Sequence, residues 1–596
     1  MMKYSESIVN WLKQEGYTHC FFVAGGNIMH LLNSVRTEMV CVPFVNEVGA
    51  AIAVESFNEL NSSKAGRAFA LVTAGPGLTN AVTGIAGAWL ESRELLIIGG
   101  QVKSSDLMAN GIRQRGIQEI DGISIVKSIT KEAVQFTCPQ QETTFKSIIR
   151  KGFSGRKGPV FIEVCLDVQG MEVIDTPNET KLQMELVEDF DLTEINEIAK
   201  IISAKVDQAK RPVILIGGGV NNKTTKPLLV ELEKMDVALM TTWNGADRVP
   251  STLKNYFGRP NTWGQRYSNV LIQQSDLVIA LGTRLGLQQT GFAWEDFSPL
   301  AKIIQVDIDS NELNKGHPKI DSGYAVDANR LLEALVLTRS KKTNEHIEWL
   351  AFAEEVRSLL PTRELGNETR SEFVDPYQFG FELSSVMDAD SVLIPCSSGS
   401  SFTSLMQTFT QRDNQRVISS KGLASMGYGL STAIGAALNQ PNNSVFLVEG
   451  DGGFAQNLQE LGTISANRLN VKIFIFSNNG YASIRMTQRN YFDGAWIGCD
   501  SETGLGLPDW QLIANSYGIS YLKLNAQGLS EPGIKDVLSM SGPLVIEVPI
   551  DPEQTFYPKI TSSIQPDGSM KSNPLHLMSP ELPESISSRV LKYLNV

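Results

Sequence analysis

The sequence has 596 residues, enough for about three or four domains at roughly 100–200 residues each. Its 52 Lys and Arg residues against 65 Asp and Glu give a net charge of −13, which argues against a nucleic-acid-binding surface. The six cysteines lie far apart without a C-x-x-C pair, so the pattern supports neither a zinc site nor a thioredoxin-like site. The longest charge-free stretch is too polar to cross a bilayer, and no signal-peptide pattern is present. We therefore expect a cytoplasmic protein.

In chain order, the first predicted element is an amphipathic helix within residues 1–16. Beyond it, short apolar runs alternate with helical patterns, which is typical of parallel α/β sheets. The predicted strands are residues 68–73, 95–98, 160–164, 213–217, 277–281, 303–308, 391–395, 444–449, 471–477 and 544–548. A polar linker at 176–187 and a charged helical linker at 339–372 separate three blocks, and the irregular tail should wrap the surface or close over a site. The blocks are residues 1–175, 190–340 and 373–550, and the tail is residues 551–596.

Two segments of the chain resemble each other weakly. LVTAGPGLTN (71–80) and LVEGDGGFAQ (447–456) both combine a strand, a glycine turn and the start of a helix. Because they lie in the first and third blocks, they suggest a duplicated sheet domain around a different middle block.

The strongest chemical signal is Gly450-Asp451-Gly452, followed after 25 intervening residues by Asn478-Asn479. Each part comes directly after an apolar strand, so the acidic and amide side chains should meet at the carboxyl edge of a parallel sheet. Their oxygens, with a backbone carbonyl and phosphate oxygens, could complete an octahedron around Mg²⁺. The alternative is a plain glycine turn and an exposed asparagine pair.

This spacing is that of the thiamine diphosphate motif, and the chain resembles the acetolactate synthase, pyruvate oxidase and pyruvate decarboxylase superfamily along essentially its whole length. VTAGPGLTNAVTGIAGAW (72–89), GGQV (99–102) and VDID (306–309) are most similar to the acetolactate synthase-like branch. The resemblance implies three doubly wound parallel-sheet α/β domains: a pyrimidine-binding domain (1–175), a central flavin-type domain (190–340) and a diphosphate-binding domain (373–550).

The resemblance also implies residue roles at the cofactor. Asp451, Asn479 and the backbone carbonyl of Tyr481 would bind Mg²⁺. The loop CSSGSS (396–401) resembles a diphosphate loop, in which Ser398, Gly399 and Ser400 would hydrogen-bond phosphate; the alternative is a plain serine turn. Further cofactor contacts implied are Thr73, Asn80, Gly450, Gly452, Gly453 and Ala482.

The implied catalytic residues are Glu47, Gln118, Gly26 and Met426. Glu47 matches the activating glutamate, which donates a proton to the pyrimidine N1′; otherwise it would be an ordinary helix-start residue. Met426 matches the apolar wedge that bends the cofactor, and the carbonyl of Ala424 would accept from the 4′-amino group. Gly26 lies in a turn similar to the family's Pro-Gly-Gly loop, and Gln118 matches a glutamine near the substrate.

The middle block carries a possible dinucleotide site. Gly217–Gly219 follow one predicted strand, Arg284 follows a second and Asp307 ends a third, which suits a pyrophosphate and a ribose. In the acetolactate synthase branch this domain binds FAD, whereas in the decarboxylases it is empty. We expect FAD in addition to thiamine diphosphate and Mg²⁺.

Two departures concern the reaction. The histidine pair with which decarboxylases protonate their intermediate is missing from RQRGIQE (113–119), which favours carboligation over aldehyde release. The tryptophan that sizes the acceptor site in acetolactate synthases is Gln488 here, with Arg485 and Arg489 nearby. These three residues suggest a polar acceptor pocket for a larger carbonyl compound, although the arginines could instead be surface charges or flavin phosphate ligands.

We therefore predict a carboligase that decarboxylates a 2-keto acid, pyruvate first, and transfers the two-carbon unit to a carbonyl acceptor. The alternatives are acetyl transfer to a nucleotide-linked keto-sugar, hydrolysis of a cyclic diketone, and a non-catalytic cofactor-binding paralogue. Partners would be small-molecule substrates only. The family brings Glu47 and Asp451 together from different subunits, so we expect a homodimer or homotetramer with the active site between subunits.

Overall fold

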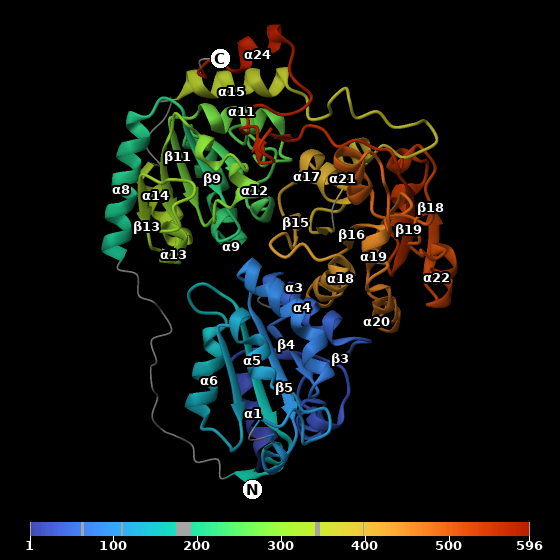
Figure 1. Ribbon diagram of the computed structural model, residues 1–596. Helices are drawn as coiled ribbons and strands as arrows, with labels where there is room; N and C mark the ends of the chain where they lie inside the picture. The colour runs from blue at the N-terminus through green and yellow to red at the C-terminus, as the bar shows by residue number, and fades with distance from the viewer. Residues whose placement is uncertain are drawn as a thin grey trace.

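The computed structural model of the chain describes residues 2–60, 65–108, 111–173, 192–339, 346–396 and 399–594. The predicted linker at 176–187 and the predicted phosphate ligand Ser398 lie outside these residues. The chain forms three parallel sheets, each packed between helices, in agreement with the predicted α/β class (Figure 1). Each of the ten predicted strands corresponds to a strand of these sheets.

The N-terminal unit is built on a six-stranded parallel sheet. Its strands, in spatial order, are β3 (Val40–Pro43), β2 (Tyr17–Phe22), β4 (Arg67–Val72), β5 (Leu95–Gln101), β7 (Pro159–Cys165) and β6 (Glu132–Phe136). The helices are α1 (Tyr4–Gln14), α2 (Met29–Val35), α3 (Glu47–Leu60), α4 (Pro76–Glu91), α5 (Gly122–Val126), α6 (Glu142–Lys151) and α7 (Leu166–Gly170). The short strands β1 (Met2–Lys3) and β8 (Glu172–Val173) pair beside them.

The middle unit has five parallel strands. In spatial order they are β10 (Ala238–Thr241), β9 (Pro212–Ile216), β11 (Leu277–Leu281), β12 (Lys302–Val306) and β13 (Ser322–Tyr324). The helices are α8 (Leu192–Gln208), α9 (Asn222–Thr225), α10 (Leu229–Lys234), α11 (Arg266–Gln274), α12 (Leu287–Thr290), α13 (Ser310–Leu313) and α14 (Ala328–Arg339). The predicted helical linker contains α15 (Ile347–Leu359), whose buried Trp349 and Phe352 join the core of this unit.

The C-terminal unit repeats the six-stranded sheet. Its strands, in spatial order, are β15 (Arg416–Val417), β14 (Val392–Pro395), β16 (Val445–Gly450), β17 (Val471–Ser477), β19 (Leu544–Pro549) and β18 (Ser520–Lys523). The helices are α16 (Pro376–Val386), α17 (Thr403–Thr408), α18 (Tyr428–Asn439), α19 (Asp451–Phe454), α20 (Leu461–Ala466), α21 (Ala482–Phe492), α22 (Trp510–Ser516) and α23 (Ile534–Ser539).

The first and last sheets share one topology. Numbered along the chain, the strands of each sheet have the spatial order 2-1-3-4-6-5. The two similar sequence segments occupy equivalent places, since β4 followed by α4 and β16 followed by α19 are both the third strand and its helix. The predicted duplication is therefore present in the topology.

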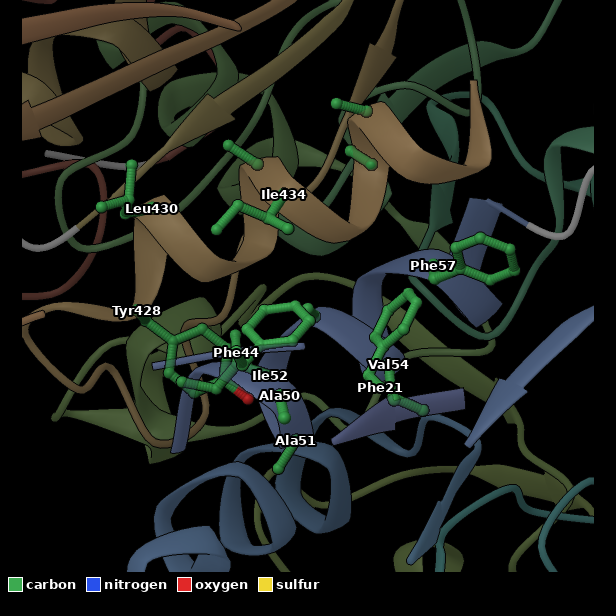
Figure 2. Close-up of a cluster of buried hydrophobic side chains, with 14 of the residues drawn as sticks. Phe21, Phe44, Ala50, Ala51, Ile52, Val54, Phe57, Tyr428, Leu430 and Ile434 are labelled. Carbon is green, nitrogen blue, oxygen red and sulfur yellow. The ribbon is translucent and has the colours of Figure 1, made fainter. Parts of the chain in front are cut away.

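The two six-stranded units share one hydrophobic core. Helix α3 packs against α18, and the shared cluster includes Phe21, Phe44 and Phe57 from one unit and Leu430 and Ile434 from the other (Figure 2). A Cβ atom at Gly435 would lie 2.1 Å from the carbonyl oxygen of Ala53, so only glycine permits this close approach of the helices. The junction fixes how the two units sit within a chain.

The predicted tail is partly ordered and returns to the middle unit. It contains the hairpin β20 (Ser562–Ile564) and β21 (Met570–Ser572) and ends in α24 (Glu584–Val590), which lies beside α15 (Figure 1). Leu575 and Val590 are buried in the core of the middle unit. Over the described ranges, the helices are too short or too polar to cross a membrane.

Candidate active site

Asp451 joins two strand ends at the carboxyl edge of the C-terminal sheet. It begins α19 directly after β16, and its side chain is buried. One carboxylate oxygen accepts from the amide of Gly452 at 2.7 Å, and the other accepts from the amides of Asn478 and Gly480, beyond β17, at 3.0 and 3.1 Å. Burial raises the pKa of Asp451 to about 6 despite these donors. A bound cation would relieve that cost.

The loop after β17 presents oxygen atoms next to Asp451. Asn479 has a φ of 63°, in the left-handed region, and its side-chain oxygen accepts from the Ser501 hydroxyl at 2.9 Å. The buried side-chain oxygen of Asn478 has no hydrogen-bond partner in the described part of the chain. The carbonyl of Tyr481 accepts from the amides of Ile484 and Arg485 at the start of α21. The carboxylate, amide and carbonyl oxygens fit a hard cation such as Mg²⁺.

Three glycine-containing segments converge at this edge. A Cβ at Gly452 would lie 2.4 Å from the Tyr481 ring, and one at Gly399 would lie 3.2 Å from the Ser483 hydroxyl. Ser400 is buried in the same turn as Gly399. Gly450 and Gly453 flank Asp451, and Ala482 is the first residue of α21. The predicted phosphate-binding segments are thus adjacent at this edge.

The turn that carries Ala424 and Met426 lies over the same edge. Ala424 has a φ of 54°, and the Met426 side chain is 39% exposed. The amide of Gln456 is 3.6 Å from the Met426 sulfur and donates to the Tyr481 hydroxyl at 3.4 Å. Gln456 therefore connects the wedge position to the metal loop, a role that its sequence context did not reveal.

The N-terminal unit assembles a second set of predicted residues. Glu47 begins α3, is 7% exposed, and accepts from the Asn80 side chain at 2.9 Å. The buried Thr73 hydroxyl has no partner among the described residues.

The turn that contains Gly26 packs against Thr73, because a Cβ at the adjacent Gly25 would lie 2.4 Å from Thr73. Gln118 has a φ of 62°, and its carbonyl would lie 2.3 Å from a Cβ at Gly75, before α4. Its neighbour Glu119, another residue that the sequence did not reveal, accepts from the amides of Arg115 and Gly116 at 2.9 and 2.8 Å. Glu119 thereby holds the loop that presents Gln118.

Within one chain, the described residues show no direct polar contact between the Glu47 carboxylate and the Asp451 loop. The backbone beside Glu47 is anchored to the C-terminal unit, because the amide of Asn46 donates to Glu460 at 3.0 Å. Among the residues that the structure describes, however, no hydrogen bond or ion pair links the Glu47 carboxylate to Asp451 or Asn479.

The three residues of the predicted acceptor pocket have different environments. Arg485 is 3% exposed, and its guanidinium donates to the carbonyls of Asn479 and Asn478 at 2.8 and 2.7 Å. Gln488 exchanges two hydrogen bonds with the backbone of Ile497, at 3.3 and 3.1 Å. Arg489 is exposed and forms an ion pair with Glu553. Arg485 therefore supports the Asn478–Tyr481 loop, whereas Gln488 is half-buried and Arg489 is exposed.

A large cavity lies where the three units meet. It has a volume of about 1000 Å³ and is lined by Gly218, Gly219, Arg284 and Asp307 from the middle unit. Gly217 packs beside it against the carbonyl of Gly282. Burial raises the pKa of Asp307.

The other two units also contribute side chains to this cavity. Arg156 from the N-terminal unit reaches Asp309 at 2.7 Å, and the Lys421 ammonium lies 4.2 Å above the ring of Phe402. Both residues are distant in sequence from the glycine motif, so only the fold could reveal them. The glycine turns, the arginines and the carboxylate fit an elongated dinucleotide.

Comparison with known proteins gave matches along most of the chain. Three successive family models match: "Thiamine pyrophosphate enzyme, N-terminal TPP binding domain" at residues 2–125, its central domain at 195–335 and its C-terminal TPP binding domain at 397–548. The probable acetolactate synthase large subunit of Methanocaldococcus jannaschii is 29% identical over 571 residues, 93% of each chain.

Two Escherichia coli K12 proteins are similar over the same span. The acetolactate synthase isozyme 1 large subunit is 28% identical over 563 residues, covering 93% of this chain and 95% of that one. The isozyme 2 large subunit is 28% identical over 591 residues, covering 97% and 100%.

Proposed function

The chain belongs to the thiamine pyrophosphate enzyme family, of the acetolactate synthase-like kind, and from this premise we propose that it is a thiamine diphosphate- and Mg²⁺-dependent carboligase. It would decarboxylate a 2-keto acid, pyruvate first, and transfer the two-carbon unit to a second carbonyl compound. The observation that carries the proposal is Asp451, a buried carboxylate that ties the Asn478–Gly480 loop to the end of β16.

The cofactor, when bound, supplies the electron sink for the carbon–carbon bond chemistry. Asp451, Asn479 and the Tyr481 carbonyl would hold the metal, and Gly399, Ser400, Gly450 and Gly452 would let the diphosphate approach the backbone. These groups would fix the position of the cofactor rather than react themselves.

Glu47 would hold the proton at the pyrimidine N1′. Its carboxylate is almost fully buried and is oriented by Asn80, so water competes little for that hydrogen bond. Met426 would fill the bend of the cofactor, with Ala424 presenting its carbonyl. Exclusion of water around the substrate carboxylate would favour loss of CO₂.

We further propose a homodimer or homotetramer with the active site between subunits. The support is the resemblance to the family, in which these two residue sets come from different subunits, together with the lack of any hydrogen bond or ion pair from the Glu47 carboxylate to Asp451 or Asn479 among the described residues. We also propose that the central cavity binds FAD, supported by its size and by the placement of Gly218, Gly219, Arg284 and Asp307.

One experiment tests the main proposal. Purified protein with thiamine diphosphate and Mg²⁺ is given pyruvate, and CO₂ and acetolactate are measured with and without added acceptors. Product formation that requires both cofactors supports the proposal. No decarboxylation of any 2-keto acid, with the cofactor bound, would refute it.

The second candidate function is transfer to a larger polar carbonyl compound, such as a nucleotide-linked keto-sugar. It is favoured by Gln488, a half-buried polar side chain on α21 where the family has a bulky indole. The same assay, run with pyruvate as donor and a nucleotide keto-sugar or a cyclic diketone as partner, compares kcat/KM for each. Hydrolysis of the cyclic diketone without pyruvate would instead favour the hydrolase alternative.

Flavin is tested separately. The purified protein is denatured and the supernatant is analysed by chromatography. We expect about one equivalent of released FAD per chain. Protein that carries no flavin and does not bind added FAD would show that the cavity serves another ligand.

A further inference from the structure

The turn 419–428, which carries Ala424 and Met426, is held at both ends by the N-terminal unit. At its start, Arg93 donates to the carbonyl of Ser419 at 2.8 Å. Glu91, at the end of α4, accepts from the amide of Lys421 at 2.6 Å and from the amide of Gly422. The start of the turn is thus bound through its backbone, whatever its side chains are.

At the other end of the turn, the Tyr428 hydroxyl donates to Glu55, in the middle of α3. Tyr428 reaches from the first residue of α18 toward the helices of the N-terminal unit (Figure 2). Arg93 closes the arrangement, since its second terminal nitrogen donates to the other oxygen of Glu55 at 2.7 Å. One guanidinium therefore links Glu55 to the opposite end of the turn.

The Glu55, Arg93 and Tyr428 side chains are shielded from water, whereas Glu91 is half-buried. Glu55, Arg93 and Tyr428 are 1%, 8% and 3% exposed. A buried ion pair adds little net stability when its desolvation is counted, and its best-attested use is to specify one geometry. A buried network at the interface of two units is therefore better explained as fixing the orientation of the turn than as adding to the free energy of unfolding.

The turn itself needs external support. Ala424 adopts a left-handed φ of 54°, which costs energy for a residue with a side chain, and the Met426 side chain is partly exposed. Inside the C-terminal unit, Asn457 donates to the Gly427 carbonyl at 2.8 Å, and the Gly427 amide donates to Glu449 at 3.2 Å. Those bonds hold the end near Gly427, and side-chain contacts of Lys421 with Phe402 and of Met426 with Gln456 add to them. Arg93 and Glu91 hold the backbone of the segment that begins at Ser419.

We infer that Glu55, Glu91 and Arg93 form a clamp that positions Ala424 and Met426 for the cofactor. This inference rests on the proposed function, because Met426 is assigned to the cofactor there. The three residues are positioning residues: they reach the reaction only through the turn. The clamp also ties the turn to α3, the helix that begins with Glu47. In the proposed assembly that Glu47 would serve the other active site of the dimer.

The first test follows the turn itself and needs no cofactor. Hydrogen–deuterium exchange of the peptide that covers residues 419–428 is measured in the purified protein for Tyr428→Phe and Glu91→Leu. Each change removes one end of the clamp, so exchange in the turn should rise about fivefold or more. The matched control is Ser56→Ala, which removes a buried bond from α3 to the Thr432 carbonyl in the same interface, at 2.9 Å, without touching the turn.

The second test follows chemistry at the cofactor. The rate of deuterium exchange at thiamine C2 should fall about tenfold in Tyr428→Phe and Glu91→Leu, because small displacements of positioning groups are costly. The dissociation constant for thiamine diphosphate should change less than about threefold, since Asp451 and Asn479 are untouched. Glu91→Gln should recover most of the rate, because its side-chain oxygen still accepts from both amides.

The outcomes separate the two proposals. If wild-type protein binds no thiamine diphosphate, the proposed function fails while the exchange test of the clamp still stands. If the cofactor binds, and Tyr428→Phe and Glu91→Leu keep wild-type rates both in the turn and at C2, the clamp is overturned. The clamp is equally overturned if Ser56→Ala produces the same losses, because the effect would then be ordinary destabilisation of the interface.

Discussion

Arg485 offers a direct test of how the metal loop is built. The guanidinium is buried and donates to the carbonyls of Asn478 and Asn479 at 2.7 and 2.8 Å. Its neighbour on the helix, Arg489, is exposed and pairs with Glu553. Replacing each arginine by methionine removes the charge but keeps an unbranched aliphatic stem, so the two variants form a matched pair.

The expected size of the effect follows from these contacts. A hydrogen bond from a charged donor contributes about 1.5–3 kcal/mol. Losing the two bonds from Arg485, with part of the loss offset by relaxation of the loop, should therefore cost about 3 kcal/mol. If this cost destabilises the ordered conformation of the Asn478–Tyr481 loop, the apparent Mg²⁺ affinity of Arg485→Met should drop on the order of 100-fold. Arg489→Met breaks an exposed pair, for which about 1 kcal/mol or less is expected.

The assay is a Mg²⁺ titration of thiamine diphosphate binding, followed by protein fluorescence, with the melting temperature of each variant as a check of folding. Arg485→Lys is the second variant, because one ammonium can reach only one of the two carbonyls well and should give an intermediate loss. The sequence alone had placed Arg485 in an acceptor pocket. If Arg485→Met leaves the Mg²⁺ titration unchanged and raises only the KM of the acceptor, the structural argument fails.

Three further predictions concern Glu47 with its partner Asn80, Gln488, and the buried Glu163 outside the site. Glu47→Gln should still bind thiamine diphosphate but lose exchange at C2, whereas Asn80→Ala should lose only part of it, because Asn80 merely orients the carboxylate; near-normal turnover in Glu47→Gln would refute the role of Glu47. Gln488→Trp should shift kcat/KM in favour of pyruvate as acceptor over a larger polar ketone, measured as a ratio in one competition assay, and an unchanged ratio would separate Gln488 from acceptor choice. Glu163 lies buried in β7, where the Gln135 side chain donates to it at 2.7 Å. Burial raises its pKa from 4.5 to about 7, so its contribution to the free energy of unfolding, roughly 3 kcal/mol, is complete below about pH 4.5 and is lost as the pH rises through about 7. Glu163→Gln should therefore gain melting temperature relative to wild type between about pH 5 and pH 8, and parallel pH profiles would contradict this sign.

Much of the fold could be predicted because central strands of parallel sheets are continuous apolar runs. VFLVEG and VKIFIFS are buried almost throughout, and both were found as strands. Some of the missed strands lack this pattern, whereas β10 (ALMT) is buried throughout and was missed despite it. β2 (YTHCFF) mixes polar and apolar residues, and the edge strand β15 has two residues, so neither carries a periodic signal.

The chemical core of the site was also accessible from the sequence, because it consists of short motifs at strand ends. Asp451 and the Asn478–Asn479 pair meet because adjacent parallel strands finish at one edge. The contacts that cross between units were not accessible. Glu55 and Tyr428 are 373 residues apart, and nothing local to either residue indicates the other.

The prediction for α21 shows where local reasoning ends. Arg485, Gln488 and Arg489 have the i, i+3, i+4 spacing that places side chains on one helical face, so a shared pocket is the natural inference from sequence. The structure leaves Arg489 exposed and Gln488 half-buried. The Arg485 guanidinium turns back to the loop before the helix and donates to two carbonyls there. Helical spacing fixes where a side chain starts. For a long cationic side chain such as Arg485, the position of the charged group depends on which acceptors lie within reach. Those acceptors are set by the tertiary structure, here the carbonyls of Asn478 and Asn479.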